Sequence, residues 1–192
     1  MANISPTVSI IYFTQGGTTA SLADTVSSGV SSTYSEAKVV RIEAQQFVEG
    51  RWKHDEILQQ RSGADAIVFD APTLMGSVAA PFKAFADATA GIWYARGLCG
   101  KLARGFTISA SPSGDKLHSL QYFNILAAQH GMLWANWDAP PKQADGTNRL
   151  GSYLGLMAQN NLSHGSPAVL GTGDSLSAKK YGQYIGELTK RL

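Results

Sequence analysis

The stretch that decides the fold is Val8–Phe13, VSIIYF, which is followed at once by the polar loop TQGGTT at residues 14–19. A nearly continuous apolar run of this length is typical of a parallel strand that is covered on both faces. Beyond the loop, Leu22, Val26 and Val30 recur every four positions and predict a helix with one buried stripe. A strand, a short loop and a helix in this order predict the start of a βαβ unit.

Further apolar segments continue this alternation along the chain. The other expected strands span residues 37–42, 64–69, 102–109 and 133–137, and the other expected helices span residues 55–61, 82–93, 117–127 and 175–192. Five strands alternating with helices predict an α/β fold, a doubly wound five-stranded parallel sheet in a three-layer αβα arrangement, because parallel neighbours need crossover connections. Residues 1–192 are expected to form a single domain, and residues 138–173 are its least periodic part.

The composition limits the classes of function. The chain has 192 residues, of which 44% are hydrophobic and 16% charged, as is typical of a soluble globular protein. Its amino terminus lacks a basic region and its first apolar run is strand-length, so we expect neither a signal peptide nor a membrane span, and a cytoplasmic location. A net charge of +2 with scattered basic residues argues against nucleic-acid binding. One cysteine, and four histidines without metal-ligand spacing, predict no disulfide and no metal.

Ligands of doubly wound sheets bind at the carboxyl ends of the strands, where the strand order reverses. The loop at residues 14–19 combines free N–H groups at a helix start with hydroxyl donors and two glycines that allow an anion to approach closely. It has no lysine and neither a Walker nor a GxGxxG pattern, which argues against a nucleoside triphosphatase or a dinucleotide fold. A neutral set of donors suits one terminal phosphate, although an ordinary turn with threonine caps would explain the same residues.

Two later loops follow the third and fourth expected strands, and they carry a resemblance to a known family. The segment at residues 70–109, with APTLMGS and then PFKAFADATAGIWYARGLCGKLA, and the ASPSG that follows it resemble the tryptophan-repressor-binding protein family of flavodoxin-like NAD(P)H:quinone oxidoreductases. The likeness extends more loosely to AAQHGM at residues 127–132 and to the final KKYGQYIGELTKRL, and so touches most of the chain.

The resemblance implies a flavodoxin-like fold, FMN as cofactor, and NAD(P)H and a quinone as substrates. It implies a two-step cycle in which hydride passes from NAD(P)H to the flavin and a quinone then accepts two electrons in the same pocket. The family's phosphate contacts match Thr14, Gln15, Gly16, Gly17, Thr18 and Thr19. Its contacts to the flavin ring and ribityl chain match Pro72, Thr73, Leu74, Met75 and Gly76 on one side and Ser111, Pro112, Ser113, Gly114 and Asp115 on the other.

Two further residues receive catalytic roles only from the resemblance. Trp93 matches the family's tryptophan near the quinone and nicotinamide pocket, although a core aromatic on the apolar stripe of its helix would explain it equally well. Gly16 stands where the family often has an aromatic residue, and Gln129 occupies the position of its flavin-contacting histidine, with His130 matching the neighbouring position. His130 could still reach the flavin, or it could cap or pack at a helix end. Family members are often dimers or tetramers, so the resemblance implies a homodimer or homotetramer.

Two alternative functions stay open from the sequence. One is a flavodoxin-type carrier of single electrons that docks on protein partners; such carriers are typically acidic, whereas this chain has 16 basic and 14 acidic residues. The other is an interaction module of flavodoxin fold that has lost the cofactor, which the departures at Gly16 and Gln129 would explain.

Overall fold

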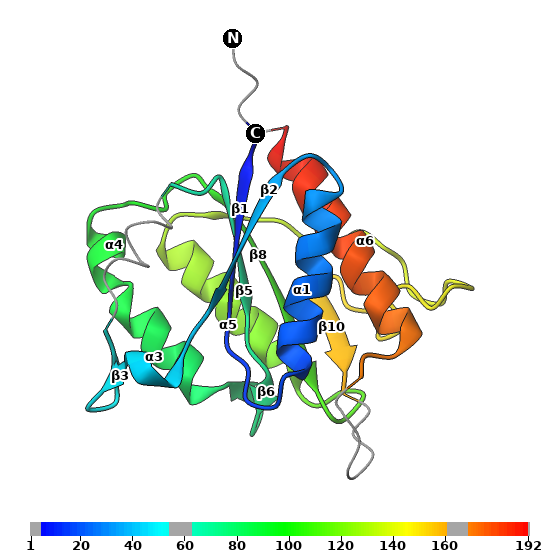
Figure 1. Cartoon of the computed structure of the whole chain (residues 1–192), viewed down its shortest axis with the longest axis horizontal. Coiled ribbons are helices and arrows are strands. Elements are labelled where there is room, and N and C mark those ends of the chain that lie inside the picture. The colour runs from blue at the N-terminus through cyan, green and yellow to red at the C-terminus, as the bar shows by residue number, and fades with distance from the viewer. Residues whose placement is uncertain (1–4, 54–62, 161–168, 192) are drawn as a thin grey trace.

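A parallel sheet forms the centre of the computed structural model, which describes residues 5–53, 63–160 and 169–191. The strand order is β10-β8-β5-β1-β2, with β9 beside β8 (Figure 1). This is the order of a doubly wound flavodoxin-like sheet, so the predicted fold class is confirmed. The bounds of the six strands are β1 (Thr7–Tyr12), β2 (Glu36–Arg41), β5 (Ala66–Asp70), β8 (Leu102–Ser109), β9 (Leu133–Trp134) and β10 (Leu156–Gln159).

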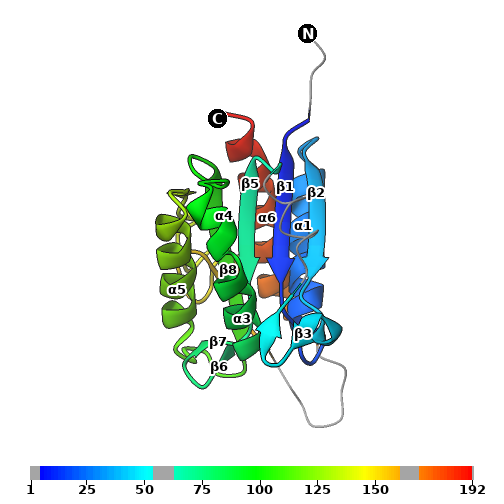
Figure 2. The same cartoon turned by 90° about the vertical axis from the view of Figure 1, so that its left-hand side faces the viewer.

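Helices cover both faces of the sheet, which gives the expected three layers. Figure 2 shows α1 (Thr18–Ser31) and α6 (Thr172–Thr189) on one face. The opposite face is covered by α3 (Ala80–Ala88), α4 (Ala90–Tyr94) and α5 (Lys116–Gln129). None of the helices in the described residues is long and apolar enough to cross a membrane.

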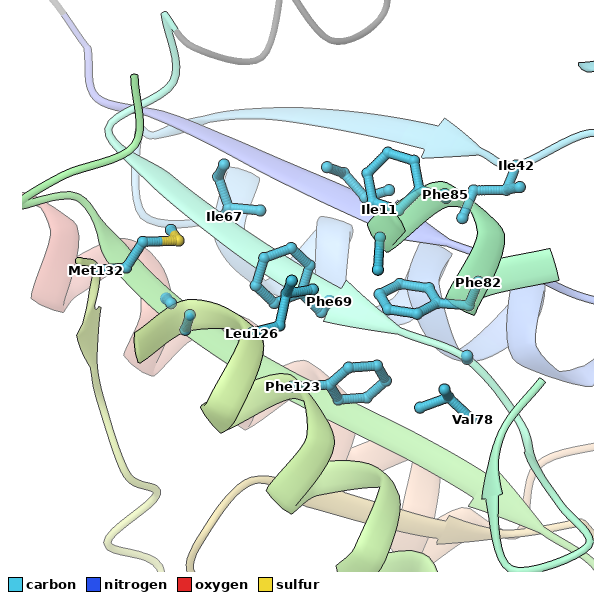
Figure 3. Packing of buried hydrophobic residues seen from close by; sticks show 14 of the residues in the cluster. Ile11, Ile42, Ile67, Phe69, Val78, Phe82, Phe85, Phe123, Leu126 and Met132 are labelled. Carbon is cyan, nitrogen blue, oxygen red and sulfur yellow. The ribbon is translucent and has the colours of Figure 1, made fainter. Parts of the chain in front are cut away.

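The side chains of the sheet contribute to two hydrophobic cores, one on each face, because successive side chains of a strand point to opposite faces. On β5, Ile67 and Phe69 pack in the core beneath α3 and α5, where the rings of Phe82 and Phe123 lie 4.9 Å apart between centroids (Figure 3). Val68, between them, belongs to the core beneath α1 and α6. The nearly continuous apolar strands in the sequence therefore reflect burial on both faces.

The fifth predicted strand is wrong beyond Trp134, because the structure splits it. β9 pairs with Leu102 and Ala103 of β8, the chain then leaves the sheet, and β10 returns beside the second half of β8. Buried Arg104 lies at the break: its Nε donates to the carbonyl of Ala135 at 3.0 Å, and its Nη2 donates to the carbonyl of Asn136. The Arg104 side chain thus binds carbonyls that, in a continuous strand, would have accepted hydrogen bonds within the sheet.

The predicted helix at residues 82–93 is also divided. α3 ends at Ala88 and α4 begins at Ala90, and the hydroxyl of Thr89 between them donates to the carbonyl of Ala86 at 2.6 Å. The helix predicted at residues 55–61 lies outside the described residues. Short elements that the sequence did not indicate are a 3-10 turn at Ala44–Gln46, the hairpin of β3 (Phe47–Val48) and β4 (Arg51–Trp52), and the hairpin of β6 (Thr73–Leu74) and β7 (Ser77–Val78).

Candidate functional site

Three loops meet at the carboxyl ends of β1, β5 and β8 and surround a pocket of about 270 Å³. The small hairpin that contains β6 marks this edge of the sheet in Figure 1. The pocket is lined by Gln15, Gly16, Thr18, Thr19, Pro72, Thr73, Leu74, Ile108, Ser109, Ala110 and Asn160. The structure therefore brings the first loop and the front of the second loop together, as the sequence leads one to expect.

The first loop leaves the start of α1 open to a ligand. Gly17 precedes the helix in a left-handed conformation with φ 87°, and its N–H donates to Thr14 Oγ1 at 3.1 Å. The N–H groups in the first turn of a helix have no intrahelical partner, and no side chain of the described residues caps α1 in their place. A Cβ atom built on Gly16 or Gly17 would meet nothing within 4 Å. An anion can approach these N–H groups and the positive end of the helix dipole.

The second loop is fixed by a network of buried hydroxyls. Thr73 Oγ1 lies 2.9 Å from Thr107 Oγ1 and 2.8 Å from Ser119 Oγ, and Thr107 Oγ1 donates to the carbonyl of Ala71 at 2.7 Å. These bonds tie the loop to β8 and to α5. The hydroxyl of Thr73 therefore positions the loop, whereas Leu74 is half-exposed at the pocket.

The tip of the second loop lies outside the pocket. Met75 is fully exposed with φ 50°, and Gly76 has φ 81°, as the turn of a two-residue hairpin requires. His118 Nδ1 lies 2.6 Å from the carbonyl oxygen of Gly76, which joins the tip to α5. Of the five residues that the resemblance assigned to this loop, Pro72, Thr73 and Leu74 line the pocket.

In the third loop, the residues that line the pocket are the first ones, not those that the resemblance implied. Ser109 and Ala110 line the pocket, whereas Pro112, Ser113 and Asp115 line a neighbouring pocket of about 670 Å³. Ser111 and Gly114, also expected as contacts, line neither of these two pockets.

A lysine that the sequence did not single out lies inside this loop. Lys116 is fully buried, and its Nζ donates to Ser109 Oγ at 2.9 Å and to the carbonyls of Ser111 at 2.7 Å and Pro112 at 3.0 Å. Burial lowers the pKa of Lys116 to about 8. The available signal was its place as the first residue of a helix, where the dipole disfavours a cation.

A buried carboxyl at the end of β5 was also missed. Asp70 lies in register with Tyr12 on β1 and Phe106 on β8, on the face of the sheet that α1 covers. It is fully buried, and neither of its carboxylate oxygens has a partner among the described residues. Burial raises the pKa of Asp70 well above its ordinary value. Burial therefore favours the neutral, protonated form of this carboxyl, which lies two residues before Pro72 in the second loop.

Trp93 and His130 lie together, but away from the three loops. Both line a shallow pocket of about 350 Å³ with Gln129. The α5 helix starts at the carboxyl edge of the sheet and, with 14 residues, carries His130 about 20 Å toward the other end (Figure 1). Trp93 is 53% exposed on α4, so it is not the core aromatic that its spacing suggested. His130 is buried and its Nε2 lies 2.9 Å from Thr89 Oγ1.

The residues of the pocket fit FMN. The uncapped start of α1 and the hydroxyls beside it supply neutral donors for a phosphate. The amide oxygen of Asn160 is buried at the pocket without a partner among the described residues, and can accept a hydrogen bond from a ligand hydroxyl. Pro72, Leu74 and Ile108 supply apolar surface for a planar ring. In the described part of the chain no three histidine, cysteine or acidic residues cluster as a metal site would require.

The comparisons with known proteins agree with this geometry. Residues 13–137 match the family described as NADPH-dependent FMN reductase. Flavodoxin FldP of Pseudomonas aeruginosa is 33% identical over 189 residues, which cover 95% of this chain and 96% of that protein. An NAD(P)H dehydrogenase (quinone) of Geobacter sulfurreducens is 25% identical over 202 residues, 96% of this chain and 98% of that protein.

A solved structure supports the same assignment. The crystal structure of the flavodoxin, WrbA-like protein from Agrobacterium tumefaciens is 33% identical, covers 97% of this chain and 99% of its own, and superposes with a TM-score of 0.73. The oxidised flavodoxin 1 of Bacillus cereus, at 19% identity and a TM-score of 0.63, shares the fold. The chain is therefore an FMN-binding oxidoreductase that belongs to the NADPH-dependent FMN reductase family, among its WrbA-like members of flavodoxin fold.

Proposed function

We propose that the chain, as a single domain, transfers electrons from NAD(P)H to quinones through bound FMN. The observation that carries this proposal is the uncapped start of α1, which opens on a pocket walled by two further loops. The names of the curated relatives support it, since proteins called NAD(P)H dehydrogenase (quinone) match over 70% and 96% of the chain.

Different residues of the pocket would bind the phosphate and the ring of the cofactor. The N–H groups of Thr18 and Thr19 and the adjoining hydroxyls would bind the phosphate, and Pro72, Leu74 and Ser109 would border the ring. FMN, when bound, supplies a ring that accepts a hydride and returns two electrons. The protein's part is to orient the ring and to keep water away from one of its sides.

A second cleft provides room for a substrate beside the cofactor. It has a volume of about 1080 Å³, lies between the β3–β4 hairpin and α3, and shares Leu74 with the FMN pocket. Arg51 and Lys53 line it, as do Lys83 and Asp87, which form an ion pair with each other. We infer that an anionic nicotinamide nucleotide would find cationic partners there.

The roles that the resemblance implies for Trp93 and His130 require a second copy of the chain, because within one chain both lie far from the pocket. We therefore propose a homodimer or homotetramer, to be tested by light scattering of the purified protein. If the purified protein is a monomer, neither Trp93 nor His130 belongs to the FMN site. We also propose a cytoplasmic location, which fractionation of expressing cells would test.

One experiment separates the proposed function from its alternatives. The protein is loaded with FMN and mixed anaerobically with NADH or NADPH in a stopped-flow instrument, and a quinone is then added. Rapid bleaching followed by quinone-dependent recovery of the flavin colour is expected. A loaded protein that neither nucleotide bleaches would favour the one-electron carrier, a role consistent with the 33% identity to a protein named flavodoxin. Failure to bind FMN at all would favour a cofactor-free module.

A further inference from the structure

Lys116 is a buried cation without an ion-pair partner among the described residues. None of the ion pairs between described residues includes it, although its side chain is fully buried. Burying a charge without a counter-charge is costly unless hydrogen bonds compensate. Such a group in a cofactor-binding loop calls for a functional reason.

The hydrogen bonds around Lys116 define its protonation state. Ser109 Oγ donates to the carbonyl of Ser111 at 3.2 Å, so towards Lys116 Nζ it acts as an acceptor. The other two partners, the carbonyls of Ser111 and Pro112, can only accept. Three acceptors require three N–H donors, which an ammonium has and a neutral amine lacks.

The positive charge lies at the wall of the FMN pocket. Ser109, which accepts from Lys116, lines that pocket. The start of α5, which no side chain of the described residues caps, adds its positive dipole end at the same place. Arg149 and Asp174, whose charges act on Lys116, are paired with each other at 2.7 Å and largely cancel. Asp115, the residue before Lys116, is exposed and lines the neighbouring pocket instead of the FMN pocket. On the side of the FMN pocket the buried ammonium therefore sets a positive potential, whereas the carboxylate of Asp115 faces solvent.

We propose that Lys116 is a positioning residue that stabilises the negative charge of reduced FMN and so raises its two-electron reduction potential. A hydride brings two electrons and one proton to the oxidised ring, which leaves the ring with one negative charge. An ammonium held behind Ser109 in a poorly solvated site is the counter-charge for that state. The inference rests on FMN binding, and it needs neither a particular nicotinamide nucleotide nor a particular quinone.

The test compares Lys116→Met and Lys116→Gln with the wild type. Lys116→Gln keeps N–H donors for the loop but removes the charge, and Lys179→Met, on the exposed side of α6, is the matched control for net charge. Each FMN-loaded protein is reduced with dithionite in the presence of redox dyes of known potential. We expect both Lys116 variants to lose about tenfold in their preference for reduced over oxidised FMN, which equals about 30 mV for a two-electron couple. Lys179→Met should match the wild type.

The outcomes separate this inference from the proposed function. Unchanged potentials in Lys116→Met and Lys116→Gln overturn it, even if NAD(P)H and quinone still react. A lowered potential supports it, even if no nicotinamide nucleotide reduces the flavin. If the variants do not fold, the wild-type protein is tested alone by following the absorption of its reduced flavin as the pH is lowered. We expect the bound flavin to keep the spectrum of the anionic reduced form to a lower pH than free reduced FMN does. A bound flavin that is neutral under those conditions overturns the inference.

Discussion

The hydroxyl of Thr73 lies 2.8 Å from the hydroxyl of Ser119, so the loop that follows β5 is tied to the helix that follows β8. Thr107 completes this buried network at 2.9 Å from Thr73. The second loop of the FMN pocket is therefore held, by one set of hydrogen bonds, to the strand and the helix that flank the third loop. A change in this set should affect the protein's stability and its hold on the cofactor together.

We expect Thr73→Val to lower the free energy of unfolding by about 1–3 kcal/mol, because it removes the partner of the buried Ser119 hydroxyl and one of the two hydrogen bonds of Thr107. The FMN dissociation constant should rise as well, since Pro72 and Leu74 lose their anchor. Urea unfolding and fluorescence titration with FMN measure the two effects. Thr25→Val, the same substitution on the outer side of α1, is the control and should change stability by less than about 0.5 kcal/mol. A Thr73→Val protein that matches this control would contradict the role of the network.

Asp70→Asn should stabilise the protein at neutral pH. The pKa of Asp70 is raised in the folded state, so the folded protein retains the proton that the unfolded chain releases near pH 4. Stability is therefore greatest below the unfolded pKa and is lost as the pH rises toward the folded pKa. The variant should be more stable than the wild type at pH 7, by about 1.4 kcal/mol for each unit by which folding raises the pKa of Asp70, and little changed at pH 4, because Asn carries no charge to bury. Thermal unfolding at both pH values measures this.

The control for that prediction is Asp24→Asn, at an exposed position of α1. It should show no gain that grows between pH 4 and pH 7. Equal gains for Asp70→Asn at both pH values would show that the carboxyl is not held neutral by burial.

Gly17 and Gly16 provide a matched pair in the phosphate loop. Gly17→Ala should cost about 1–2 kcal/mol, since a side chain disfavours its φ of 87°. Gly16 has no positive φ and is open to solvent, so Gly16→Ala should change stability by less than about 0.5 kcal/mol. Circular dichroism during urea unfolding compares the two. Equal costs would mean that the loop adopts a different backbone conformation from the one described here.

The sequence predicted the parts of the fold that depend on local patterns. The strands β1 and β5 are mostly apolar and β8 carries a weaker apolar pattern, and the pocket loops could be found because they follow those strands. The split of the fifth strand could not be foreseen, because it depends on Arg104 reaching carbonyls more than 30 residues further along the chain. Lys116 was missed for a similar reason, since burial of a charge is a property of the tertiary fold.

Trp93 shows the limit of a resemblance. Its match to the family's tryptophan suggested a role at the substrate pocket, and its place on an apolar stripe suggested a core aromatic. The structure of one chain fits neither role, because the side chain is half-exposed and lies at the far end from the FMN pocket. Helical spacing identified the stripe, but the break at Thr89 turned its last part toward solvent.

Arg104→Met should destabilise the protein strongly while leaving FMN affinity nearly unchanged. The substitution keeps an unbranched apolar stem but removes the donors to the carbonyls of Ala135 and Asn136, and with them the guanidinium that lies 4.3 Å from the ring centre of Tyr184. Loss of two hydrogen bonds from a charged donor to these partly buried carbonyls should cost about 2–4 kcal/mol together. Urea unfolding measures the loss, and Arg191→Met, exposed at the end of the chain, is the control. Arg104 lies near the amino end of β8, away from the pocket at the other end of the strand. A large fall in FMN affinity at unchanged stability would place its effect in the pocket instead and contradict its role as the residue that splits the fifth strand.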